Sequence, residues 1–251
     1  MLVVAGLSAC SSSAPRPGLS SVHRTSAGTT TSPAGSSVSG PTSTAPASLA
    51  APASAALTAD QLRAVVLKAS DLPAGWTAAA FKADPKAAAE NAAQAACVGV
   101  RNTDSDKVAD VHSSSFSLGG ESVDSEATSY RAVSDLALER TALKSPKWAP
   151  CSQSVLTRFL PGVLAAGITL VSVSVKAMST RAASGIVGSS DATVVVSRNG
   201  ARVTDYQRSV FIQGRRASAQ LNVTNLGRTP PRSQLQTLAA VLLTRLGGRT
   251  G

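Results

Sequence analysis

The sequence predicts an α+β domain in which a twisted antiparallel sheet carries helices packed on it. Three observations lead to this fold class. The C-terminal half contains runs of alternating apolar and polar residues that are rich in β-branched side chains, as strands are. Asn199-Gly200 separates two of these runs, which is typical of a two-residue type I′ hairpin. The last apolar segment instead repeats every three to four residues, which indicates a helix.

The chain begins with a short apolar stretch that ends in Leu7, Ser8, Ala9 and Cys10. These four residues resemble a bacterial lipobox, the motif that ends the signal peptide of a lipoprotein. The resemblance implies a signal peptide over 1–9, cleavage before Cys10, and a lipid on its thiol that anchors the protein to the outer face of the cell membrane. Because signal peptides start with a basic segment and none precedes this stretch, we expect translation to begin further upstream.

Residues 10–57 are almost wholly Ser, Thr, Ala, Pro and Gly, with Arg16, His23 and Arg24 as the only basic side chains and no acidic one. Such a composition cannot bury enough apolar surface to offset the entropy lost on ordering. We therefore predict a disordered linker over 10–57 and a single extracytoplasmic domain over 58–251.

Four helices are predicted within this domain. Thr58 and Gln61 fit a capping box that opens a helix over about 59–70. A second helix is expected over about 85–96 and a third over about 131–143. The final helix follows two prolines and gathers six apolar residues on one face: Leu235, Leu238, Ala239, Leu242, Leu243 and Leu246.

The strands are expected to pair antiparallel with their neighbours, because short turns join several of them. The predicted strands are Val108–Leu118, Ser122–Tyr130, Ile168–Val175, Ala192–Ser197, Arg202–Ile212 and Arg216–Thr224.

Beyond Cys10 the chain has two cysteines, Cys97 and Cys151. In an exported domain an even pair predicts a disulfide. A loop of about fifty residues closed in this way would stabilise the fold by roughly 4 kcal/mol on the chain-entropy model. A redox or metal-binding pair would instead call for a CxxC spacing or nearby histidines, which the sequence does not show.

No pattern in the domain specifies a reaction. His112 is its single histidine, no G-x-S-x-G elbow surrounds a serine, and no metal-ligand spacing or phosphate-binding glycine loop is present. We read His112 as a strand residue and expect no enzyme, no cofactor and no metal site. A hydrolase with paired carboxylates stays open as an alternative, because carboxylate separation depends on the fold.

Charge is unevenly distributed along the chain. Residues 57–139 hold seven Lys and Arg against twelve Asp and Glu, a net charge of −5, whereas residues 140–251 hold fifteen against two, a net charge of +13. Arginines near the predicted hairpins could attract an anionic small molecule, lipid headgroups, a cell-wall polymer or an acidic protein, or could simply keep the surface soluble. These arginines are Arg198, Arg202, Arg208, Arg215 and Arg216. Nucleic acid is not an expected partner, because the domain is exported.

The domain contains the short segments Asp71-Leu72-Pro73-Ala74-Gly75-Trp76 and Ser145-Pro146-Lys147-Trp148-Ala149-Pro150-Cys151. These two segments and the closing helix resemble the mycobacterial PknH-like extracellular sensor domains. The resemblance covers most of residues 58–251. It implies an extracytoplasmic α+β domain with a central antiparallel sheet, a ligand groove and no established catalysis, and it makes Cys97 the partner of Cys151. This chain departs from the kinase sensor by having one cysteine pair instead of two and no kinase or transmembrane segment.

Taken together, the sequence predicts a membrane-anchored lipoprotein with a non-enzymatic ligand-binding or sensor-like domain. Trp148, Tyr206 and Arg208 are the candidate ligand residues, although Trp148 first reads as a core aromatic. The alternative is a scaffold of the PsbP lipoprotein type that binds another envelope protein or a lipid, and a hydrolase comes third.

Overall fold

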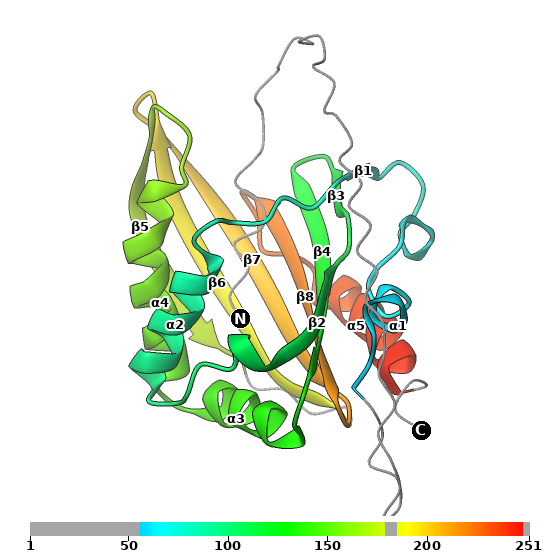
Figure 1. Ribbon diagram of the computed structural model, residues 1–251. Helices are drawn as coiled ribbons and strands as arrows, with labels where there is room; N and C mark the ends of the chain where they lie inside the picture. Colours follow the sequence, from blue (N-terminus) through cyan, green and yellow to red (C-terminus); the bar gives the residue numbers. More distant parts are fainter. Residues whose placement is uncertain (1–55, 179–184, 248–251) are drawn as a thin grey trace, which may run out of the picture. The chain divides into compact units, whose positions relative to one another are not determined.

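The computed structural model describes residues 56–178 and 185–247, so Cys10, the predicted signal peptide and nearly all of the predicted linker lie outside the described residues. The described strands form one eight-stranded antiparallel sheet in the order β1-β3-β4-β8-β7-β6-β5, with β2 also paired to β4 (Figure 1). They are β1 (Thr77–Ala79), β2 (Lys107–His112), β3 (Ser115–Leu118), β4 (Glu121–Tyr130), β5 (Ile168–Ala177), β6 (Ile186–Arg198), β7 (Ala201–Gln213) and β8 (Ala217–Leu226).

Five α-helices accompany the sheet: α1 (Ala59–Arg63), α2 (Ala87–Val98), α3 (Val133–Lys144), α4 (Trp148–Phe159) and α5 (Arg232–Gly247). The α+β fold class predicted from the sequence is therefore confirmed. Asn199 and Gly200 connect β6 to β7 with positive φ angles of 51° and 81°, as a type I′ turn requires. Within the described residues, no helix is long and apolar enough to cross a membrane.

Each face of the sheet carries an apolar core. On one face, called the α5 face here, β4, β8 and β7 point Val123, Leu221 and Ile212 into a core shared with α1 and α5. On the other, the α4 face, β5 and β6 pack Val173 and Val194 against α2 and α4 in a second core. Figure 1 shows α2, α3 and α4 on the side of the sheet opposite to α5.

The α4 face becomes polar where β4, β8 and β7 form it. Asn222 is its centre: its side-chain carbonyl accepts hydrogen bonds from Ser209 and Gln220, each at 2.8 Å, and its amide donates to Asp124 at 3.0 Å. The buried polar residues on this part of the face are Asp124, Glu126, Thr128, Asp205, Ser209, Gln213, Ser218, Gln220, Asn222 and Thr224.

The first helix is shorter than predicted. The capping box of Thr58 and Gln61 is present, but α1 ends at Arg63 instead of near residue 70. Val65, Val66 and Leu67 are buried outside α1, a short 3-10 helix follows over Ala69–Asp71, and the Leu67 N–H donates to the Ser125 hydroxyl of β4 at 2.8 Å. The Leu67 N–H thus bonds to a side chain of the sheet instead of to the carbonyl four residues earlier, as it would in a continued helix.

The strand predicted over 108–118 is divided into β2 and β3. At the break, the Ser113 hydroxyl accepts the Ser125 N–H at 2.9 Å and donates to the Ser114 carbonyl at 2.8 Å. The Ser113 hydroxyl therefore accepts the Ser125 N–H in place of a backbone carbonyl, which would accept it if the strand were continuous.

Helix α4 was not predicted. Pro150 lies in its first turn, where backbone N–H groups have no intrahelical partner, so the ring is tolerated there. This helix carries Cys151, which is joined to Cys97 of α2 by a disulfide with a Cα–Cα distance of 5.7 Å. The bond links the two helices over the second core.

Candidate functional sites: a pocket under α5 and an acidic cluster

A pocket of about 340 Å³ lies between α5 and strands β6 and β7. Part of its wall is apolar, formed by Ile186, Val210, Leu235 and Ala239 together with Met178. The rest is polar and includes Arg208, Asp191, Ser189, Arg232 and Gln236. An apolar body with a few polar groups is the usual composition of a small-molecule site.

Arg208 forms one wall of this pocket, as a residue of β7 directly opposite Asp191 of β6. Its Nε and Nη2 lie 2.9 and 3.1 Å from the two oxygens of Asp191, and its Nη1 donates to the Pro230 carbonyl at 2.8 Å. The bidentate pair is electrically neutral as a unit. Exposed Arg232 forms no ion pair with any described residue, so it supplies the pocket's net positive charge.

The three predicted ligand residues do not converge. Tyr206 is half-buried on β7, on the same face as Arg208 and two residues from it. Trp148 lies on the opposite face, 5 % exposed, with its ring edge-to-face to Phe211 at 5.5 Å. It borders a separate cavity of about 70 Å³ among α2, α3 and β2, so its main role is in the core.

The arginines near the hairpins do not form one patch either. Arg198 and Arg202 lie at the β6–β7 turn, whereas Arg215 and Arg216 lie at the β7–β8 turn, at the opposite end of β7. These four arginines therefore lie at opposite ends of the sheet, and the structure does not bring them together at one end.

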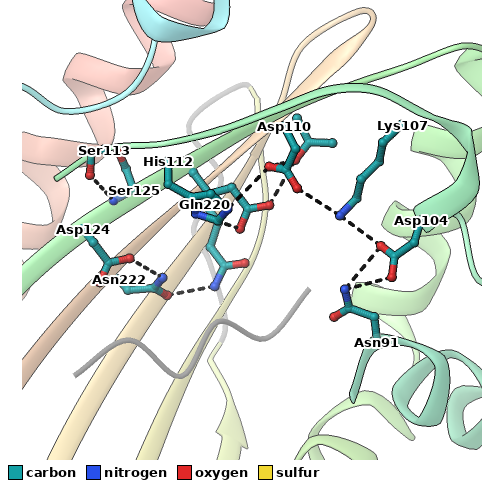
Figure 2. Close-up of polar contacts among 12 residues, drawn as sticks. Asn91, Asp104, Lys107, Asp110, His112, Ser113, Asp124, Ser125, Gln220 and Asn222 are labelled. Atoms are coloured by element: carbon teal, nitrogen blue, oxygen red, sulfur yellow. Dashed lines mark hydrogen bonds and ion pairs between the residues drawn. The ribbon is translucent and has the colours of Figure 1, made fainter. Parts of the chain in front are cut away.

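A second site is an acidic cluster on the α4 face, where edge strand β2 pairs with β4. The register sets His112 opposite Glu126 and Asp110 opposite Thr128, and all four side chains point to the same face. A register shift between Lys107 and Ala109 turns Lys107 to that face as well. Figure 2 shows the Lys107 ammonium between Asp110 and Asp104, 3.3 and 2.9 Å from their carboxylates.

The cluster perturbs the acids and bases within it. Burial raises the pKa of Glu126 well above its usual value, and the neighbouring charge of Asp110 raises it further. Burial lowers the pKa of His112, against the opposing effect of Asp110. For Lys107, burial opposes the charged form, but the carboxylates of Asp110, Glu126 and Asp104 outweigh it and raise the pKa.

No metal site was expected from the sequence, yet Asp110, His112 and Glu126 each offer one ligand atom, and these atoms lie within 4.8 Å of one another. One signal was available. Asp110 and His112 are two residues apart in a strand and so share a face. The position of Glu126 depends on the β2–β4 register, which the predicted continuous strand over 108–118 concealed.

Comparison with known proteins gives little further guidance. No protein-family model matches the chain. No curated protein matches it either. Among solved structures, the extracellular domain of PknH from Mycobacterium tuberculosis is similar to it with 8% sequence identity, 76% coverage of this chain, 97% coverage of that chain and a TM-score of 0.39. At this TM-score the similarity supports no argument about fold or function.

Proposed function

We propose that this chain is a lipid-anchored, extracytoplasmic binding module without a catalytic role, and that the pocket under α5 binds a small amphipathic molecule with one acidic group. The observation that carries the proposal is the pocket itself. Its volume of about 340 Å³ falls in the range of small-molecule sites, and its wall combines apolar side chains with arginines.

The charges on the pocket wall favour a monoanionic ligand. Arg208 is neutralised by Asp191, which leaves Arg232 as the wall's uncompensated charge. An acidic group near Arg232 would gain a charge-assisted hydrogen bond, while an acyl or aromatic body would cover Val210 and Leu235. A cationic ligand would gain the apolar contacts but meet repulsion from Arg232.

The proposed location rests on the lipobox-like residues Leu7 to Cys10 and on the disulfide between Cys97 and Cys151, which suits an oxidising compartment. A binding role fits the surroundings of His112, the single histidine of the described residues. It faces two carboxylates and the ring of Phe81, not a serine or cysteine nucleophile.

Calorimetric titration of the full chain with dodecanoate tests the pocket. We expect binding of dodecanoate, weaker binding of dodecylamine, and roughly tenfold weaker dodecanoate binding in Arg232→Gln because a charge-assisted contact is lost. Arg228→Gln removes a neighbouring exposed arginine outside the pocket and should bind like the parent chain. Equal weakening by both substitutions, or equal binding of the amine, would rule out the proposed site.

Labelling cells with an alkyne fatty acid tests the anchor. We expect the label to appear on the exported protein and to disappear in Cys10→Ala. Export without label, or a label that persists in Cys10→Ala, would refute lipid attachment at Cys10 and leave the pocket to be judged separately.

A further inference from the structure

We propose that Asp110, His112 and Glu126 bind one divalent transition-metal ion, for which Zn²⁺ is the best match. This inference is independent of the proposed ligand pocket, because the cluster lies on the α4 face and the pocket on the α5 face.

The three side chains lie around one point, and one ion would draw their ligand atoms together. His112 Nε2 lies 3.8 Å from Asp110 Oδ1, and His112 Nδ1 lies 3.9 Å from Glu126 Oε2. These two distances start from different imidazole nitrogens, whereas one ion is bound by a single nitrogen; with one ligand atom taken from each residue, the three atoms lie within 4.8 Å of one another. Bonds of about 2.0–2.1 Å in tetrahedral geometry separate ligand atoms by roughly 3.3 Å, so the side chains must approach one another by up to about 1.5 Å.

The unpartnered oxygen of Glu126 is the independent sign of a ligand. The Glu126 side chain is 4 % exposed, and its Oε2 has no hydrogen-bond partner. The other oxygen, Oε1, accepts from the Thr128 hydroxyl at 3.1 Å. A buried carboxylate oxygen without a partner is costly, and a cation at this point would satisfy it.

The donor set defines the class of ion. One imidazole nitrogen and two carboxylate oxygens suit Zn²⁺ and Mn²⁺, whereas Ca²⁺ and Mg²⁺ prefer sites made of oxygen alone. Neither described cysteine is available as a ligand, because Cys97 and Cys151 form the disulfide. A hard-cation or thiolate site is therefore not indicated.

Surrounding residues hold the donors in place. The Phe81 ring stacks on His112 with the centroids 3.7 Å apart and the planes 3° from parallel. The Lys107 ammonium contacts Asp110 through Oδ2, which leaves Oδ1 toward the histidine. Outer contacts of this kind fix the orientation of metal ligands. Because β2 is an edge strand on β4, a bound ion would cross-link the two strands and stabilise that edge.

Titration of the full chain with ZnCl₂ or MnCl₂, followed by calorimetry and by thermal unfolding, tests the site. We expect one Zn²⁺ per chain, a rise in the unfolding temperature, and weaker binding of Mn²⁺. His112→Phe, which keeps an aromatic ring against Phe81, and Glu126→Gln should each weaken Zn²⁺ binding by roughly tenfold or more.

Two controls separate this site from adventitious binding. His23→Ala removes the chain's other histidine, and Glu90→Gln removes a buried carboxyl outside the cluster. Both should bind Zn²⁺ like the parent chain, and so should Arg232→Gln. If the parent binds neither metal, or if folded His112→Phe or folded Glu126→Gln binds Zn²⁺ unchanged, the proposal is wrong. Circular dichroism identifies which variants are folded. If neither His112→Phe nor Glu126→Gln folds, Asp110→Asn, at a more exposed position, provides the test: unchanged Zn²⁺ binding by this variant would refute the site.

Discussion

Strands β4, β8 and β7 bury apolar side chains on the α5 face of the sheet and polar side chains on the α4 face. On the α5 face, β4, β8 and β7 present Val123, Leu221 and Ile212 to a continuous apolar core. One residue further along, the same strands present Asp124, Asn222 and Gln213 to the α4 face. Alternation in a strand makes this division possible, because adjacent side chains point to opposite sides.

The difference shows which face is built for stability. Apolar burial contributes favourable free energy in proportion to area, whereas polar burial is at best compensated by hydrogen bonds. Within the described residues, three buried oxygens on the α4 face have no hydrogen-bond partner: Glu126 Oε2, Asp205 Oδ1 and Thr224 Oγ1. We infer that the α5 face supplies most of the stability and that the α4 face is held in part by the disulfide.

Loss of the disulfide should have the largest effect. Cys97→Ser with Cys151→Ser opens a loop of 54 residues in sequence separation and should lower the free energy of unfolding by about 4 kcal/mol. Urea denaturation with and without a reducing agent measures this change. Hydrogen exchange should show lost protection in α2 before α5, and equal loss in both helices would contradict the contrast between the two faces.

A cavity in the α5 face should come next. Leu221 is fully buried in a central strand, so Leu221→Ala should lower the free energy of unfolding by about 3 kcal/mol. Leu226→Ala, on the same strand at a position 37 % exposed, should cost less than about 1 kcal/mol. Comparable losses in the two variants by urea denaturation would refute the role given to this core.

The pH dependence of stability should reveal the unfavourable free energy of burying carboxylates on the α4 face. Burial raises the pKa of Asp205 from 3.8 to about 6, so the folded state holds the proton more tightly than the unfolded state. The stability gained from this group is complete below pH 3.8 and is lost as pH rises through about 6, an effect on the order of 3 kcal/mol.

Asp205→Asn should therefore reduce the slope of stability between pH 4 and 7, as measured by urea midpoints, while Asp124, whose pKa burial also raises to about 6, keeps part of it. Asp60→Asn is the control, because the Asp60 side chain is 88 % exposed. A profile that keeps the parent's slope in Asp205→Asn would show that another group produces it.

The smallest effect is expected at the β6–β7 turn, outside both cores. Gly200 has a φ of 81°, so Gly200→Ala places a Cβ in a left-handed conformation and should cost about 1 kcal/mol. Open space surrounds this position, so strain alone should act. A loss as large as that of Leu221→Ala in thermal unfolding would mean that the turn sets the sheet register more strongly than the core does.

Local signals in the sequence predicted elements well where structure depends on nearby residues. The Asn199-Gly200 turn and the apolar repeat of α5 are each specified by residues within the element itself. The length of α1 and the break at Ser113 could not be predicted in this way, because both depend on hydrogen bonds to Ser125 of β4. Helix α4 was not predicted, and Pro150 fits a helix there only because it lies in the first turn, a position that composition does not reveal.

The sequence by itself determined the α+β class, the hairpin, the closing helix and the candidates for lipid attachment and disulfide pairing. These depend on periodicity, turn chemistry and residue type, all of which are local. Only the tertiary structure decided that Arg208 pairs with Asp191 beside a pocket, that Trp148 lies on the opposite face, and that Asp110 and His112 meet Glu126. These groupings depend on which strands pair and in what register, and that is fixed by the packing of the whole sheet.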